Sequence, residues 1–147
     1  RHPENVEMGT IYDDLARRDF TINAIAQDEE GNILDPFNGR EDLKNRILRT
    51  VGNPKDRFTE DSLRVIRAIR FASRFSMQID FETEVQLRSI YWAKPVSLLP
   101  IDRIREELHK MFKDSTSRSL EYLNLLPPFT REAIWSRIWL KPTTEEK

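Results

Sequence analysis

The sequence predicts an α+β protein in which a short strand-containing part precedes a purely helical part. Up to about residue 55, apolar stretches are short and are separated by turn residues, as in a β-hairpin. From Thr59 onward, apolar residues recur at the spacing of amphipathic helices. The length of 147 residues suits one compact domain or two small ones. We therefore expect two domains, residues 1–55 and 56–147.

The first part is predicted to contain a short helix, a hairpin and a strand. Residues 13–19 are polar and helix-compatible, with Thr10 as a candidate N-cap. Two apolar stretches, residues 20–26 and 33–34, flank an acidic turn that contains a glycine, which indicates a β-hairpin. A short helix over residues 40–46 and a strand over 47–51 should follow, and Gly52-Asn53-Pro54 ends that strand.

The second part is predicted to be built from helices alone. Thr59 is a plausible N-cap, because Glu60 and Asp61 then lie in the first turn, where the helix dipole favours negative charge. Proline residues 95 and 100 should bound a link between helices. The expected helices cover residues 59–75, 82–92, 101–112, 117–125 and 131–140.

Composition excludes several classes of site. The chain has no Cys, which rules out a disulfide scaffold, a thiolate metal site and a Cys nucleophile. No apolar run approaches the roughly 20 residues that span a bilayer, and the N-terminal residues do not resemble a signal peptide, so we expect no membrane and a cytoplasmic location. A Gly-rich phosphate loop and a close carboxylate pair on a strand are also missing. We therefore assign no metal ligand from these patterns.

Charge is distributed unevenly along the chain. The net formal charge of −1 hides a balance of −6 over residues 1–38 and +5 over residues 39–74. A neutral chain with a basic middle part favours a local anion site over a surface that coats nucleic acid uniformly.

The helix predicted over residues 59–75 separates apolar and basic faces. On a helical wheel, Arg67, Arg70 and Arg74 fall within about 60° of one another, and Arg64 lies beside them. Asp61 is one turn before Arg64, so the two side chains should reach a common point and address the edge of a nucleobase. Arg67 and Arg70 would then hold phosphates. The alternative is a solvated face whose arginines pair with acids from elsewhere in the chain.

A second basic cluster is Arg17-Arg18-Asp19. Its arginines are suited to an anion, and Asp19 is able to accept a hydrogen bond from a sugar hydroxyl. The alternative is a helix C-terminus with favourable basic charge. We assign Asp35 and Asp42 to turns and caps, and the three Trp, Trp92, Trp135 and Trp139, to the core or an interface.

Residues 14–24 include the run Arg17-Arg18-Asp19-Phe20-Thr21-Ile22-Asn23-Ala24, and residues 57–72 include Glu60-Asp61 followed by Arg64. These segments resemble the RRDFTINA motif and the EDxxR helix of the class II nucleotidyltransferases, the group of CCA-adding, A-adding and CC-adding enzymes and bacterial poly(A) polymerases. Residues 35–54 and 103–108 resemble two further family motifs. The resemblance runs in order from about residue 3 to residue 125.

The resemblance implies a role for each candidate residue. Asp61 and Arg64 would form Watson–Crick-like hydrogen bonds with incoming ATP or CTP, and Arg67 and Arg70 would face the nucleotide. Arg18 would contact the triphosphate, and Asp19 the ribose 2′-hydroxyl.

The family's catalytic loop and its two Mg²⁺-binding aspartates do not occur in these residues. The resemblance therefore implies no catalytic or metal-binding residue in this chain, and a head segment outside it is an expected partner. The resemblance thus implies part of an enzyme that adds CMP and AMP to the 3′ end of tRNA. Within the family, a poly(A) polymerase or an A-adding or CC-adding enzyme is the alternative. A non-catalytic nucleotide- or RNA-binding module is the alternative from another class.

Overall fold

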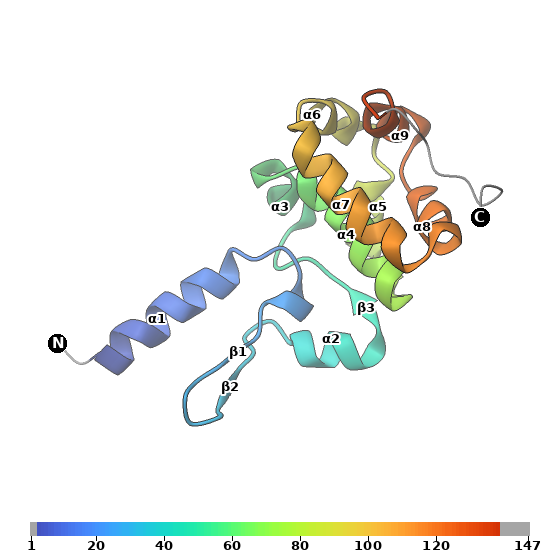
Figure 1. Cartoon of the computed structure of the whole chain (residues 1–147). Helices are drawn as coiled ribbons and strands as arrows, with labels where there is room; N and C mark the ends of the chain where they lie inside the picture. Colours follow the sequence, from blue (N-terminus) through green and yellow to red (C-terminus); the bar gives the residue numbers. More distant parts are fainter. Residues whose placement is uncertain (1–2, 139–147) are drawn as a thin grey trace.

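The computed structural model describes residues 3–138, which form a mainly helical α+β structure. In Figure 1, helix α1 projects from the body of the molecule, and the hairpin and α2 lie below the bundle of later helices. The elements of the first part are α1 (Pro3–Ala16), η1 (Thr21–Asn23), β1 (Ala26–Gln27), β2 (Ile33–Leu34), α2 (Gly39–Asn45) and β3 (Ile47–Leu48).

The second part consists of short helices and one further strand. Its elements are α3 (Pro54–Glu60), α4 (Leu63–Phe75), β4 (Gln78–Ile79), α5 (Phe81–Leu87), η2 (Ile90–Trp92), α6 (Ala93–Ser97), α7 (Ile101–Asp114), α8 (Thr116–Leu123) and α9 (Pro128–Trp135). Helices α7 and α8 both pack on α4, and α9 packs on α6. No helix within residues 3–138 has the length and apolar character needed to cross a membrane.

The predicted hairpin is confirmed, although its strands are shorter than expected. Strands β1 and β2 pair antiparallel, with Ala26 opposite Leu34. Residues 20–26 are not one strand, because Phe20 forms only a single bridge to Thr50 and η1 follows it. The buried Thr21 hydroxyl donates to Asp42 at 2.6 Å, which holds η1 against α2.

The approach of η1 to α2 requires a glycine at the start of α2. A Cβ at position 39 would lie 2.0 Å from the Thr21 carbonyl oxygen, so any other residue would push the two elements apart. The predicted turn and cap roles are confirmed at Asp35, whose carboxylate accepts from the backbone N–H groups of Gly39 and Arg40. The helix near residue 13 begins at Pro3, so Thr10 lies inside α1 and does not cap it.

A strand pair that we did not predict joins the two parts of the chain. Strand β3 pairs parallel with β4, with Ile47 opposite Gln78. The Arg49 guanidinium reinforces this connection, because it donates to Asp80 at 2.7 Å and to Asp42 at 3.1 Å. The pairing crosses the domain boundary that we expected after residue 55.

The helix predicted over residues 59–75 is broken in two. Asn53 caps α3 by accepting from the Lys55 N–H at 2.8 Å, and Thr59 lies in the last turn of that helix. The backbone of Asp61 is extended, with φ −155° and ψ 104°, so the chain changes direction before α4 begins. The Asp61 side chain accepts from the Leu63 N–H at 3.1 Å and so stabilises the start of α4.

Two further predicted boundaries differ from the structure. Residues 93–97 form α6 where we expected a link, because Pro95 lies in the first turn of a helix and needs no N–H partner there. The last helix begins at Pro128 and ends at Trp135. The predicted range of 131–140 extends beyond residue 138, where the description of the structure ends. The prediction for Trp139 therefore lies outside the described residues.

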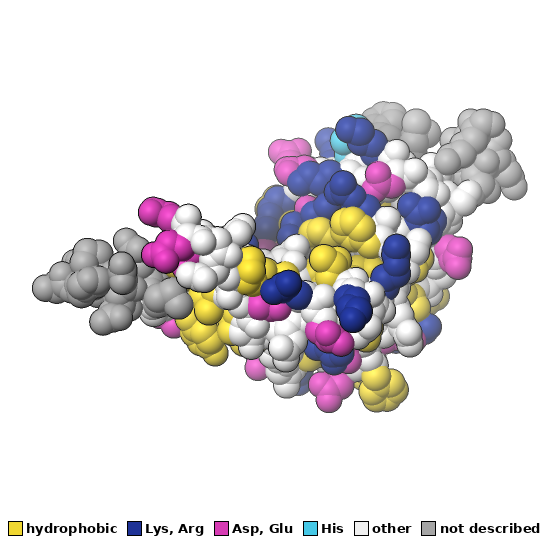
Figure 2. Space-filling view, turned by 90° about the horizontal axis from the view of Figure 1, so that it is seen from below, with side chains coloured by type: hydrophobic (Ala, Val, Ile, Leu, Met, Phe, Trp, Pro, Cys, Tyr) yellow, Lys and Arg dark blue, Asp and Glu magenta, His cyan; other side chains and the backbone are white. Residues whose placement is uncertain are grey.

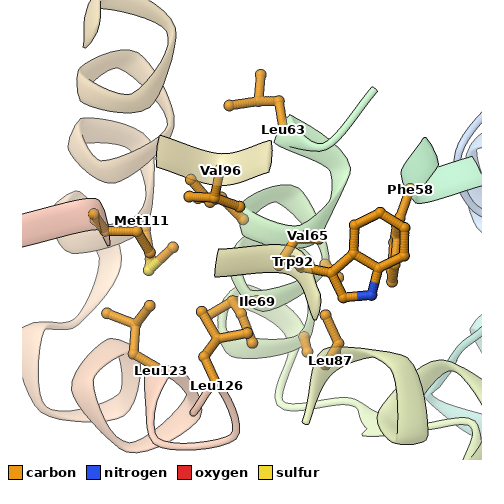
Figure 3. Packing of buried hydrophobic residues seen from close by; sticks show 14 of the residues in the cluster. Phe58, Leu63, Val65, Ile69, Leu87, Trp92, Val96, Met111, Leu123 and Leu126 are labelled. Carbon is orange, nitrogen blue, oxygen red and sulfur yellow. The ribbon is translucent and has the colours of Figure 1, made fainter. Parts of the chain in front are cut away.

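The main hydrophobic core lies among the helices of the second part (Figure 3). Trp92 is 1% exposed and meets Phe58 edge-on, with ring centroids 5.6 Å apart, which confirms its assignment to the core. Trp135 is partly buried and packs against the same cluster. Phe20 and Leu48, from the first part, also belong to this core. A much smaller cluster of Leu15, Ala24 and Val51 holds α1 to the hairpin region.

Candidate nucleotide-binding cleft

The C-terminal end of α1 is fixed to the helical part by two arginines. Arg57 donates to the Ala16 carbonyl at 2.9 Å, and Arg64 donates to the Arg17 carbonyl at 3.0 Å. These carbonyls have no partner within α1, so the guanidinium groups satisfy the end of the helix. The contacts place the next residues, Arg18 and Asp19, against α4.

A cleft of about 610 Å³ opens between the end of α1, α4 and α7. Five of the six residues predicted for a nucleotide site line it, namely Arg18, Asp19, Asp61, Arg64 and Arg67. Helix α7 contributes further charged residues, and Leu63 and Phe71 add apolar surface. In Figure 2, Lys and Arg side chains are interspersed with Asp and Glu on the face seen from below.

The carboxylate of Asp61 is held in a defined orientation. Arg103 of α7 donates to Oδ2 at 2.8 Å and to Oδ1 at 3.3 Å. Burial raises the pKa of Asp61, but hydrogen bonds from Arg103 and Leu63 and the charges of Arg103 and Arg64 outweigh this effect and hold the pKa below its ordinary value of 3.8. Oδ2 has one protein partner among the described residues, so it keeps acceptor capacity toward the cleft.

Arg64 also lines the cleft, but its direct partner is not Asp61. Its guanidinium donates to Glu60 at 2.8 Å and to the Arg57 carbonyl at 3.2 Å. We expected the side chains of Asp61 and Arg64 to reach a common point. Both line the same cleft, but they do not bond to each other. The reason is the break between α3 and α4, which removes Asp61 from the helical spacing that we assumed.

Asp19 and Arg67 form an ion pair at the back of the cleft. Arg67 Nε donates to Asp19 Oδ2 at 2.6 Å, and Asp19 is only 6% exposed. Asp19 Oδ1 also accepts from the Phe20 N–H at 2.8 Å and from the Asn23 amide at 3.3 Å. Arg18 is more accessible and is held by Asp14 at 2.7 Å and by the Asn23 carbonyl at 3.1 Å.

Arg70 differs from the prediction, because it is buried and is absent from the lining of the cleft. Its Nε donates to Glu107 at 2.5 Å, and its guanidinium lies 4.4 Å from the ring centroid of Phe71. Glu107 also approaches Arg67 at 3.6 Å. At Arg70, therefore, the structure matches the alternative interpretation, in which the arginines of this helix pair with acids from elsewhere in the chain.

The residues that sequence reasoning missed are those that α7 contributes. Arg103, Glu106, Glu107 and Lys110 all line the cleft. Positions 103, 107 and 110 follow the i, i+4, i+7 spacing of one helix face, a signal that was present in the sequence. Within residues 3–138, no three His, Asp or Glu side chains are grouped closely enough to hold a metal ion.

Comparisons with known proteins relate this chain to RNA-extending nucleotidyltransferases. The family described as Poly A polymerase head domain matches residues 1–49. A curated CCA-adding enzyme from Oceanobacillus iheyensis is 43% identical over 125 residues, which cover 84% of this chain and 31% of the relative. The chain therefore spans about a third of the length of the curated relatives that it matches.

Solved structures of CCA-adding enzymes share the fold. The Bacillus stearothermophilus enzyme in complex with CTP matches 84% of this chain and 32% of its own, with 38% identity and a TM-score of 0.72. The Thermotoga maritima enzyme complexed with tRNA matches 90% of this chain and 32% of its own, at 30% identity and a TM-score of 0.73. A CCA-adding enzyme in complex with ATP covers 92% of this chain and 33% of its own, at 32% identity and a TM-score of 0.76.

Proposed function

We propose that this chain, which belongs to the family of the CCA-adding enzymes, forms the nucleotide-selecting part of an enzyme that adds CMP and AMP to the 3′ end of tRNA. The observation that carries the proposal is that one cleft holds both a carboxylate that accepts hydrogen bonds and a guanidinium that donates them. Asp61 presents an ionised carboxylate with acceptor capacity, and Arg64 presents a guanidinium that only donates.

These two side chains suit the edges of adenine and cytosine. Each base has an exocyclic amine, which donates to a carboxylate, beside a ring nitrogen, which accepts from a guanidinium. Uracil and guanine present a carbonyl oxygen where the amine would be, so Asp61 would face an acceptor. A buried polar group left without a partner costs about 1–3 kcal/mol, which is enough to reject the wrong base.

The remaining cleft residues are suited to the sugar and the phosphates. Arg18 is half-exposed at the cleft rim, where an anion would compete with its exposed ion pair to Asp14. Arg67 lies deeper, and its ion pair holds Asp19 in place for a ribose hydroxyl. Arg70 is assigned a positioning role, because it fixes Glu107 and does not reach the cleft.

The reaction that we propose is attack of an RNA 3′-hydroxyl on the α-phosphate of CTP or ATP, with release of pyrophosphate. In such reactions Mg²⁺ activates the hydroxyl and neutralises charge. The described residues do not fit this ion, so we assign Mg²⁺ to residues outside this chain and derive no metal step from the cleft.

A poly(A) polymerase is the second candidate, because the head-domain family that matches residues 1–49 carries that name. Such an enzyme uses ATP alone. Binding of CTP with an affinity similar to that of ATP therefore favours CCA addition over this candidate.

Nucleotide binding by the chain tests the proposal. Titration calorimetry should show binding of CTP and ATP and at least tenfold weaker binding of UTP and GTP. Asp61→Asn should reduce this discrimination to within a few-fold, because an amide offers a donor as well as an acceptor. Arg64→Ala should weaken CTP and ATP binding by at least tenfold.

Lys55→Gln is the matched control, since it removes an exposed cation of α3 that does not line the cleft. It should leave both affinity and discrimination unchanged. Equal affinity of the unmodified chain for all four nucleotides would overturn the proposal.

A further inference from the structure

Helix α7 carries a second hollow on the face turned away from the cleft. A groove of about 430 Å³ runs between α7 and α9. Two cations of α7, Arg105 and Lys113, line it together with the imidazole of His109. Leu108 and Phe112 of the same helix and Trp135 of α9 supply an apolar floor.

The cations of this groove differ from those of the cleft in their partners. On the cleft side, Arg103 pairs with Asp61 at 2.8 Å and Lys110 with Glu106 at 3.2 Å. Among residues 3–138, no carboxylate lies within ion-pair distance of Arg105, His109 or Lys113, and no acid lines the groove. The three side chains are exposed, so the groove presents uncompensated donors to an anion.

The floor of the groove offers aromatic surface. The rings of Phe112 and Trp135 have centroids 6.1 Å apart and planes tilted by 41°. Both residues are partly buried, and Leu108 below them is 6% exposed. Aromatic faces beside a row of cations are the combination that binds single-stranded nucleic acid, with bases stacked and phosphates paired.

We propose that this groove binds a single-stranded segment of RNA, and this inference rests on the proposed function. Hydrogen-bond donors recur once per turn of α7, at the cations Arg105 and Lys113 and at His109 between them, with a rise of about 6 Å between neighbours. Such a row suits the repeating charge of a polynucleotide backbone. An acidic protein segment is less well matched, because it does not carry a flat ring with each of its charges, as a polynucleotide does.

The position of the groove fits an RNA whose end enters the cleft. Lys110, which lines the cleft, lies one residue from His109, which lines the groove. The two hollows are therefore separated by no more than the width of one helix, about 10–12 Å. A strand held in the groove is able to pass around α7 and reach the nucleotide.

Fluorescence anisotropy with a labelled oligocytidylate of about ten nucleotides tests the groove. The double variant Arg105→Gln/Lys113→Gln should weaken RNA binding by about tenfold at low salt. It should also reduce the slope of log K against log salt by about 1.4, because two phosphate contacts are lost. CTP binding in the cleft should not change.

The matched control is Lys44→Gln/Lys55→Gln, which removes the same charge from exposed positions on α2 and α3. This control should retain RNA affinity within about twofold. Equal losses in both double variants would reduce the effect to non-specific attraction and overturn the proposal. RNA binding that neither variant changes would also overturn it and would leave a protein segment as the occupant.

Stacking provides a readout independent of charge. Trp135→Phe preserves an aromatic floor, and the variant should melt within a few degrees of the unmodified chain. Quenching of tryptophan emission by the oligonucleotide should fall by more than half in this variant, and unchanged quenching would contradict stacking in the groove. Because CTP binding is measured separately, loss of nucleotide selection alone would count against the proposed function, and loss of RNA binding alone against the groove.

Discussion

The first and last pairs of arginines on α4 each lie about one helical turn apart, but their environments differ. Arg64 and Arg67 line the cleft. Arg70 is buried with Glu107, and Arg74 lies at the surface, where its side chain is 53% exposed and its nearest acid is Asp114 at 3.7 Å. The difference teaches that the neighbouring helix, and not the spacing of the arginines, decides whether each one is available to a ligand or fixed by an ion pair.

The largest difference within this comparison should be one of stability. Arg70→Ala leaves the Glu107 carboxylate, whose side chain is 5% exposed, with only the more distant Arg67. Removing one partner of a buried ion pair costs about 3–5 kcal/mol. Urea unfolding of the chain should show this loss in Arg70→Ala, and a loss of about 0–1 kcal/mol in Arg74→Ala, whose pair is exposed.

A double variant separates the burial of charge from packing. Arg70→Met/Glu107→Leu removes both charges together, so it should recover most of the stability lost in Arg70→Ala. An Arg70→Ala variant no less stable than Arg74→Ala would show that the two ends of α4 do not differ as described.

An intermediate effect is expected at Arg67, which both lines the cleft and holds Asp19. Arg67→Ala removes the 2.6 Å hydrogen bond to a carboxylate that is 6% exposed, and Asp19 keeps its bonds from Phe20 and Asn23. The free energy of unfolding should fall by about 1–3 kcal/mol, and CTP affinity should also fall. Intact CTP affinity would place Arg67 with Arg70 as a purely structural residue.

The smallest effect should come from Arg103, and it should depend on pH. The pKa of Asp61 lies below its ordinary value of 3.8 in the folded chain, so this carboxylate stabilises the fold at neutral pH, and that contribution is lost as the pH falls through the folded pKa. At neutral pH, Arg103→Gln should cost about 0–1 kcal/mol, since the pair is partly exposed.

Unfolding experiments at pH values from neutral to well below 3.8 check this sign. The gap in stability between Arg103→Gln and the unmodified chain should narrow on acidification, because Asp61 becomes protonated in both. A gap that widens toward low pH would contradict the role given to this ion pair.

Much of the cleft could be predicted because its residues lie in short segments with local patterns. The spacing of Arg64 and Arg67 and the Arg18-Asp19 pair pointed to an anion site, and the structure brings these four residues to one cleft. The fate of Arg70 could not be predicted, because its partner Glu107 lies 37 positions away in the sequence. Periodicity reports which face of a helix is polar, but it does not report which residue of another helix will neutralise that face.

The fold shows the same limit. The apolar spacing of α4 and α7 is regular enough to predict both helices. Strand β4 has only two residues, which is too short for an alternating pattern, and its pairing with β3 depends on the return of the chain after α4. The break at Asp61 was missed because no proline or glycine marks it, and hydrogen bonds from its own neighbours and from Arg103 stabilise it.

The extended backbone at Asp61 connects two rigid helices, α3 and α4, and it sets the position of the Asp61 carboxylate. Every added or deleted residue in α3 or at the start of α4 would rotate one segment by about 100° and advance it by about 1.5 Å. The acid would then swing out of reach of Arg103 even though every side chain of the cleft was still present. Insertions between α3 and α4 should therefore be far less tolerated than insertions in the exposed turn between β1 and β2, whose residues do not line the cleft.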